Sequence, residues 1–146
     1  MSSATRPPDV RRSSSDPAAR PAIAAVLATY RRPALLRRCL AALVAQEGIA
    51  RDRYEIVVVD DGRSEETREE VDAFARATAG APTVRYLRPE GTRGPAAARN
   101  RGWRAARAPI IAFTDDDTVP DDRWLAEALA ALTPELVAVS GRVVVP

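Results

Sequence analysis

Short apolar runs alternate with longer amphipathic segments from Pro21 onward, and this alternation limits the possible folds more than any other feature of the sequence. Such alternation is typical of βαβ units and of a mainly parallel sheet. Residues 56–59 (Ile-Val-Val-Val) are apolar at consecutive positions, as expected for a central strand that is covered on both faces. The sequence therefore predicts strands at residues 22–28, 54–60, 83–87, 109–114 and 136–145.

Apolar residues at spacings of three and four predict a helix after each of the first four strands. The first helix begins near Pro33, because proline is favoured in the first helical turn. The second follows Ser64, a good N-cap residue, and has Glu65 and Glu66 in its first turn. The third is expected from about residue 94 to residue 106, and the fourth from residue 121 or 122.

The residue types that the chain lacks limit its chemistry. It has no histidine, and all 22 of its basic residues are arginines. No Ser-His-Asp triad, histidine-bound zinc, Schiff-base lysine or Walker-type phosphate loop can therefore form within it. Its single cysteine, Cys39, permits no internal disulfide and is interpreted as a small core residue rather than a reactive thiol. A net charge of +2 indicates neither a nucleic-acid partner nor a membrane partner.

Length and local composition predict one domain with a tail. Residues 1–20 carry Pro, Ser and Arg with almost no large apolar side chains, so they are expected to be a disordered tail. Residues 21–146 are expected to form one domain, apparently truncated after the fifth strand and so incomplete at its C-terminus. No stretch approaches the ~20 apolar residues of a membrane span. The lone cysteine favours a cytoplasmic setting, with attachment to the inner face of a membrane as an alternative.

Acidic side chains gather where two predicted strands end. Asp60 and Asp61 follow the second strand, and Asp115, Asp116 and Asp117 follow the fourth. Open parallel sheets bind ligands outside the carboxyl ends of their strands, and clustered carboxylates need a compensating cation. Mg²⁺ and Mn²⁺ are usually held by one or two carboxylates together with phosphate oxygens and water. The pattern predicts a metal-bound diphosphate, with helix capping by these acids as the alternative.

Four sequence blocks follow one another in a specific order: Ala-Val-Leu-Ala-Thr-Tyr-Arg-Arg-Pro at 25–33, Val-Val-Val-Asp-Asp-Gly at 57–62, Gly-Pro-Ala-Ala-Ala-Arg-Asn-Arg-Gly at 94–102 and Phe-Thr-Asp-Asp-Asp at 113–117. The ordered set resembles the family 2 glycosyltransferases of the GT-A fold over about residues 22–146. The resemblance implies a Rossmann-like, mainly parallel sheet with helices on both faces. It also implies a hexosyltransferase-like enzyme that moves a sugar from a nucleotide-diphosphate donor to an acceptor hydroxyl, inverting and metal-dependent.

The resemblance also implies roles for individual residues. Asp61 is expected to accept the imide N–H of a uracil ring, which favours a UDP-sugar donor. Arg31 and Arg63 depart from the family, which usually has Asn and Ser at these positions. The acceptor is unknown, and the general base is expected beyond Pro146. The residues expected to bind the nucleotide sugar are Thr29, Tyr30, Arg32, Asp60, Asp61, Arg99, Asn100, Asp115 and Asp116.

The triple aspartate occupies the Asp-x-Asp (DXD) position of the family. Asp117 is expected to bind Mg²⁺ or Mn²⁺, and Asp115 is expected to contact the ribose or to act as a second metal ligand. Asp116 can exchange roles with either, because three consecutive aspartates leave the register open. An extended segment would place Asp115 and Asp117 on one side and Asp116 on the other.

The third predicted helix is interpreted as turning Ala96, Arg99 and Trp103 inward, so that Arg99 needs a nucleotide or an acidic partner. A solvated position for Arg99 is the alternative. Trp103 and Trp124 are interpreted as core residues rather than acceptor-stacking platforms. Arg85, Arg88 and Arg93 are interpreted as ordinary surface residues.

Two other functions remain open at this level. A sugar-phosphate nucleotidyltransferase would share the architecture and the use of a metal. Such an enzyme normally has a Gly-rich, basic loop after its first strand, where this chain has Ala28, Thr29 and Tyr30. A non-catalytic nucleotide-binding domain is the other alternative.

Overall fold

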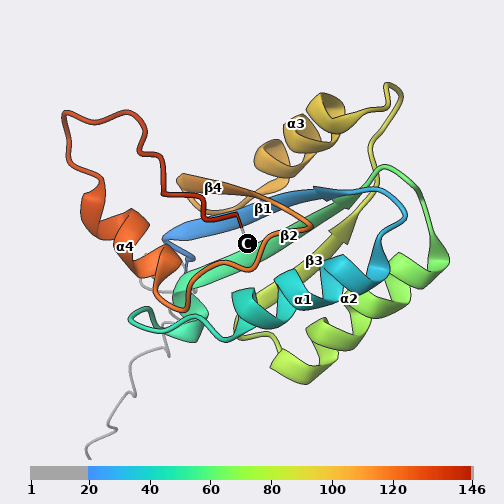
Figure 1. The fold of residues 1–146 in the computed structure, drawn as a ribbon, viewed down its shortest axis with the longest axis horizontal. Coiled ribbons are helices and arrows are strands. Elements are labelled where there is room, and N and C mark those ends of the chain that lie inside the picture. Colours follow the sequence, from blue (N-terminus) through green and yellow to red (C-terminus); the bar gives the residue numbers. More distant parts are fainter. Residues whose placement is uncertain (1–19, 146) are drawn as a thin grey trace, which may run out of the picture.

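A four-stranded parallel sheet forms the centre of the structure, a computed structural model that describes residues 20–145 (Figure 1). The strand order is β3-β2-β1-β4, and every pair of neighbours is parallel. The strand β2 lies inside the sheet, as its uninterrupted apolar run indicated. Residues 1–19 of the predicted tail lie outside the described part of the chain. The strands are β1 (Ile23–Thr29), β2 (Tyr54–Asp60), β3 (Thr83–Leu87) and β4 (Ile110–Asp115).

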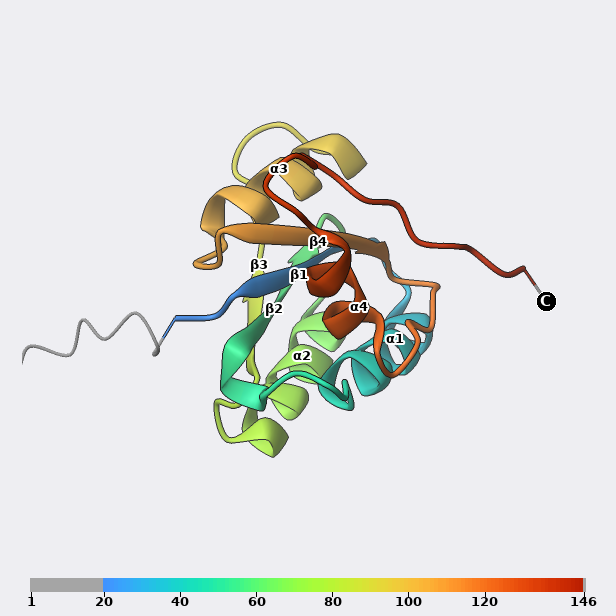
Figure 2. The same cartoon turned by 90° about the vertical axis from the view of Figure 1, so that its left-hand side faces the viewer.

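Helices cover both faces of this sheet, as the two views show (Figures 1 and 2). Helices α1 (Pro33–Val44) and α2 (Glu65–Thr78) lie on one face, and α3 (Pro95–Ala105) lies on the other. A short 3₁₀ helix, η2 (Arg51–Arg53), leads into β2, and α4 (Trp124–Ala131) follows β4. This arrangement confirms the predicted α/β class with a mainly parallel sheet. Among the described residues, no helix is long and apolar enough to cross a lipid bilayer.

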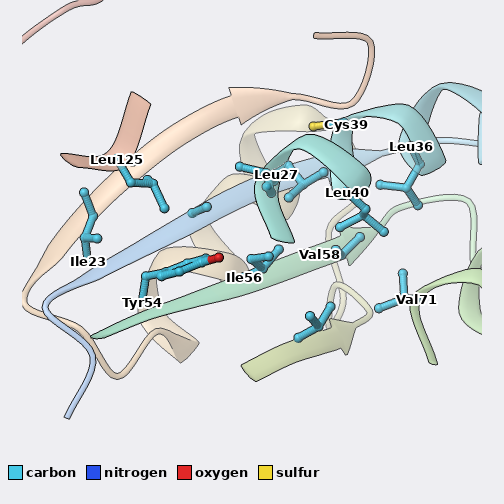
Figure 3. Close-up of a cluster of buried hydrophobic side chains, with 14 residues drawn as sticks. Ile23, Leu27, Leu36, Cys39, Leu40, Tyr54, Ile56, Val58, Val71 and Leu125 are labelled. Atoms are coloured by element: carbon cyan, nitrogen blue, oxygen red, sulfur yellow. The ribbon is translucent and has the colours of Figure 1, made fainter. Parts of the chain in front are cut away.

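Successive residues of the central strands point to opposite faces, so each face has its own apolar cluster. Ile23 and Leu27 of β1 pack beneath α1 and α2 with Cys39 (Figure 3), which confirms the core interpretation of this cysteine. Ala24 and Val26 of β1 pack against Ala98 of α3 on the other face. The position of each helix over the sheet is therefore set by the alternation of side chains along β1 and β2.

The fifth strand predicted at residues 136–145 is wrong. None of these residues belongs to a strand in the structure, and Val137 and Val143 are fully or largely exposed. The prediction rested on β-branched residues, but a strand also needs a neighbour whose main chain accepts and donates hydrogen bonds. Residues 136–145 have no such neighbour in the described sheet, and β4 is consequently one of its two edge strands.

Candidate functional site

The carboxyl ends of β1, β2 and β4 meet at one edge of the sheet. The strand register pairs Thr29 with Asp60 and Ala28 with Asp115, so the acidic residues predicted from sequence end the two strands that flank β1. We call the loops at this edge, residues 29–32, 60–64 and 115–117, the acidic edge. Ligands of open parallel sheets bind at such an edge.

Asp116 is the buried member of the triple aspartate, with 6% of its surface exposed. Its Oδ2 atom accepts a hydrogen bond of 2.7 Å from Thr29 Oγ1, and Thr29 is itself buried. The guanidinium of Arg32 lies 3.8 Å from the other oxygen. Asp116 therefore ties the end of β4 to the end of β1.

Asp115 and Asp117 are exposed and face different arginines. Arg99 of α3 donates to Asp115 Oδ1 at 2.7 Å, and Arg32 lies 3.6 Å from Asp117 Oδ2. Asp115 of the acidic edge is thus the acidic partner that Arg99 was expected to need. Exposure alternates along the run as predicted, although the two outer carboxylates turn to different partners. Within the described part of the chain, no three Cys, Asp or Glu side chains lie close enough together to hold a metal ion.

Asp60 is completely buried and has three donors. Its carboxylate accepts hydrogen bonds from Gly62 N at 2.9 Å, Ser64 N at 2.7 Å and the Tyr86 hydroxyl at 2.9 Å. The Ser64 side chain in turn accepts from Thr67 N and caps α2, as predicted. The geometry therefore gives Asp60 a role in holding the loop that leads into α2.

Asp61, the next residue, has one oxygen that is bonded and one that is not. Its Oδ2 atom accepts from Gly94 N at 3.0 Å, whereas its Oδ1 atom is buried and has no hydrogen-bond partner among the described residues. A buried carboxylate oxygen without a donor is costly, so this atom is suited to accept an N–H from a ligand. Gly94 precedes α3 with a φ of 109°, a conformation that glycine adopts without strain.

The orientation of α3 differs from the sequence prediction. Ala98 and Gly102 face the sheet, whereas Ala96 is exposed and Trp103 is 44% exposed. A Cβ on Gly102 would collide with Val26 Cγ1, so small residues let the helix approach β1 closely. The core interpretation of Trp103 is therefore wrong, because the contact has no room for an indole. The same interpretation of Trp124 is confirmed, since it packs against the cluster beneath α1 and α2.

A shallow hollow of about 490 Å³ lies between α3 and β4, beside Asp115. Two predicted site residues, Arg99 and Asn100, line it, and the Asn100 side chain accepts from Trp103 Nε1 at 3.1 Å. Tyr30, another predicted site residue, is 54% exposed and lies against the Arg31 guanidinium, 5.4 Å from its ring centre. The residues of the hollow are Ala96, Arg99, Asn100, Trp103, Ile111 and Phe113.

Sequence reasoning missed the contribution of β3 to the acidic edge. Tyr86 bonds Asp60, and Arg88, interpreted as a surface residue, donates through Nε to the Tyr86 hydroxyl at 3.0 Å. Away from this edge, near the start of β2, Arg85, interpreted in the same way, lies 3.4 Å from the buried carboxylate of Glu55. The available signal was the two-residue period of β3, but its register against β2 is not visible in the sequence.

Burial also sets the protonation of Cys39, whose thiol lies near the acidic edge. Burial raises the pKa of Cys39 to about 11, and the thiol lies 3.6 Å from the main-chain oxygen of Asp115. Cys39 is therefore protonated at neutral pH and serves as packing under the acidic edge.

Known structures share this architecture and define its class. A mannosyltransferase, PcManGT from Pyrobaculum calidifontis, in complex with GDP-Man and Mn²⁺, is 30% identical with a TM-score of 0.66, over 78% of this chain and 33% of that chain. S. aureus TarS 1–349 in complex with UDP has a TM-score of 0.62 at 22% identity, over 74% of this chain and 31% of that chain. The fold is that of the GT-A glycosyltransferases.

Residues 24–146 match Glycosyl transferase family 2, and the chain belongs to this family. Validoxylamine A glucosyltransferase of Streptomyces hygroscopicus subsp. jinggangensis is 37% identical over 113 residues, which are 76% of this chain and 25% of the relative. Succinoglycan biosynthesis protein ExoO of Rhizobium meliloti is 38% identical over 104 residues, which are 70% of this chain and 28% of the relative. The chain thus spans about a quarter of the length of these curated relatives.

Proposed function

We propose that this chain is the donor-binding part of a glycosyltransferase that moves a sugar from a nucleotide diphosphate to an acceptor hydroxyl. The observation that carries the proposal is the buried, unpartnered Oδ1 atom of Asp61, at the same sheet edge as the exposed carboxylates of Asp115 and Asp117. Membership of family 2 and the GDP-Man complex of the mannosyltransferase support a nucleotide-sugar ligand. A cytoplasmic setting is part of the proposal, on the basis of the single buried thiol.

Asp61 is the residue that would recognise the base. Its free oxygen is placed to accept an N–H, and a uracil ring offers one such donor at its imide, so UDP is the favoured nucleotide. Tyr30 is half exposed, directly follows Thr29, whose main-chain oxygen accepts from Asp61 N, and offers a ring face for stacking. Arg99 and Asp115, which pair at 2.7 Å, would meet the ribose and the sugar on the side of α3.

The exposed carboxylates fit a divalent cation that a diphosphate helps to hold. Asp117 and Asp115 each offer oxygens to solvent, and one or two carboxylates plus phosphate oxygens are a usual set for Mg²⁺ or Mn²⁺. When bound, such an ion would offset the negative charge that develops on the leaving diphosphate. Arg32, whose guanidinium lies 3.8 Å from Asp116 and 3.6 Å from Asp117, would be available to contact phosphate oxygens.

Transfer with inversion completes the proposal. The acceptor hydroxyl would attack the anomeric carbon directly while the bond to the diphosphate breaks, which requires a general base near the acceptor. Asp61 would bind and orient the nucleobase. Arg99 and Asp115 would hold the ribose, and Arg32 would contact the phosphates beside the carboxylates. These residues position the donor and leave the proton transfer to a group near the acceptor.

Calorimetric titration of the purified chain with UDP and with GDP, each with and without Mn²⁺, tests the proposal. Asp117→Ala should remove most of the metal-dependent affinity, because it removes one of the two exposed carboxylates of the proposed metal pair. Asp52→Ala is the matched control, since Asp52 is also exposed but lies in η2, at the start of β2. Equal affinity of wild type and Asp117→Ala would remove Asp117 from the metal site, and failure of both nucleotides to bind would overturn the proposed function.

A further inference from the structure

A chain of hydrogen bonds links β3 to the acidic edge. Arg88 Nε donates to the Tyr86 hydroxyl oxygen at 3.0 Å, and this hydroxyl donates to Asp60 Oδ2 at 2.9 Å. Asp60 then accepts from the main-chain amides of Gly62 and Ser64. Bonds in such a series polarise one another, because a hydroxyl that accepts from a guanidinium becomes a better donor.

The register of the sheet explains why Tyr86 reaches this position. Tyr86 is paired with Val58 of β2, and Asp60 lies two residues further along the same strand, on the same face. The Tyr86 ring packs against the apolar cluster of that face, and burial raises the pKa of its hydroxyl. Tyr86 therefore stays protonated at neutral pH and is available as a donor to a carboxylate that has no exposed surface.

Asp60 holds the main chain that follows Asp61. It precedes Asp61 in sequence, and its side chain holds the amides of Gly62 and Ser64, which follow. Asp61 itself is held by its own N–H, which donates to Thr29 O at 3.0 Å, and by the bond from Gly94 N. The direction of the unpartnered Oδ1 atom thus depends on a loop whose shape the Asp60 carboxylate fixes.

We propose that Tyr86 is a positioning residue that acts through Asp60 to aim the Asp61 carboxylate at the nucleobase, and that it thereby sets how strongly the site selects a base with an N–H donor. The inference rests on the proposed function. Tyr86 itself does not contact the nucleotide sugar in this scheme. Without the Tyr86 hydroxyl, the buried Asp60 carboxylate loses one hydrogen-bond donor. The loop at 60–64 can then change its shape so that the carboxylate finds another donor.

The test compares two tyrosine-to-phenylalanine variants. Tyr86→Phe removes the hydroxyl that bonds Asp60, and Tyr54→Phe removes a hydroxyl that donates to Val44 O at 3.3 Å, at the opposite end of β2. Tyr86→Phe loses the bonds of its hydroxyl to Asp60 and from Arg88, Tyr54→Phe loses one bond, and both tyrosines pack in the same apolar cluster. Thermal unfolding of both shows whether they lose similar stability, so that a difference in binding reports position rather than folding.

The readout is selectivity for the base N–H. Calorimetry with Mn²⁺ gives the affinity ratio of UDP to N3-methyl-UDP, or of GDP to N1-methyl-GDP if GDP binds more tightly to wild type. We expect the wild-type chain and Tyr54→Phe to prefer the unmethylated nucleotide by about tenfold or more, since a hydrogen bond to a charged group is lost on methylation. The ratio should fall several-fold in Tyr86→Phe. Arg88→Met, which leaves the tyrosine in place, should lower it in the same direction and serves if Tyr86→Phe does not fold.

An unchanged ratio in Tyr86→Phe, or in Arg88→Met where the first variant fails to fold, overturns the positioning role, even if both nucleotides bind more weakly. An equal fall in Tyr54→Phe also overturns it, because the effect would then follow from stability alone. Failure of wild type to bind any of these nucleotides overturns the proposed function, and the role of Tyr86 with it.

Discussion

The three consecutive aspartates have three different environments. Asp116 is buried against Thr29, whereas Asp115 and Asp117 stay exposed and pair with Arg99 and Arg32. Each carboxylate has its own donor or cation, which offsets the repulsion within a run of three like residues. A single run of identical residues thus provides one structural tie and two carboxylates that a ligand can reach.

Cys39 allows a prediction about pH at the same scale. Burial raises the pKa of its thiol from 9.0 to about 11, so between these two values the unfolded chain loses a proton that the folded chain keeps. The free energy of unfolding should therefore be unaffected by this group below pH 9 and should fall by about 2–3 kcal/mol as the pH rises to 11.

Urea unfolding of wild type and Cys39→Ala at several pH values from 8 to 11 measures this effect. The variant loses stability at every pH, because it leaves a cavity, but its free energy should decline less steeply above pH 9. Parallel curves for the two proteins would show that another group causes the decline, such as Tyr54 or Tyr86, whose pKa values burial also raises.

At the scale of elements, the sheet and the order of its helices could be predicted from the hydrophobic period. The apolar side chains of β1 and β2 point to both faces, so helices must cover both faces to keep them out of water. The rotation of α3 could not be predicted. An apolar tryptophan suggested the inward face, but the contact is made by the small residues Ala98 and Gly102. Size rather than hydrophobicity decided this contact.

Gly102→Ala tests the close approach of α3 to the sheet. Alanine favours helices over glycine by about 1 kcal/mol, yet its Cβ would collide with Val26 and lie 3.1 Å from Val59 Cγ2. We expect a net loss of about 1–3 kcal/mol in the free energy of unfolding, because overpacking outweighs helix propensity.

Two further variants make the comparison specific. Gly141→Ala should leave stability unchanged, since Gly141 is exposed and lies outside any helix or strand. Val26→Ala opens space at the contact, so its combination with Gly102→Ala should cost less than the sum of the two single changes. A neutral or stabilising Gly102→Ala would mean that α3 has room to move away from β1.

At the scale of the whole molecule, the acidic edge could be placed from sequence because parallel strands end together, and the resemblance to the family identified its four segments. The partners within that edge could not be predicted, because they depend on side chains that meet across elements, as Tyr86 and Asp60 do. The prediction of a strand at 136–145 was wrong for a related reason, since a strand needs a neighbouring strand to pair with as well as β-branched residues.

The architecture of the edge predicts that metal and nucleotide stabilise the domain together. Within the described residues no three carboxylates or thiols converge, so the protein offers a divalent ion too few ligands until phosphate oxygens complete the set. UDP with Mn²⁺ at about a hundredfold excess over the Kd should stabilise the fold by about 2.7 kcal/mol and raise the Tm by several degrees. Mn²⁺ alone should have little effect, and UDP alone an intermediate one.

Differential scanning calorimetry with Mn²⁺, with UDP and with both measures this coupling, and Asp117→Ala should reduce the joint shift to that of UDP alone. The coupling is reciprocal, so Mn²⁺ should tighten UDP binding by the same factor by which UDP tightens Mn²⁺ binding. A shift with Mn²⁺ alone as large as that with both would indicate a preformed metal site and would contradict this prediction. Arg32 and Arg99 should weaken the binding of Mn²⁺ alone, because their charges already offset those of Asp117 and Asp115 and a lone cation must compete with them.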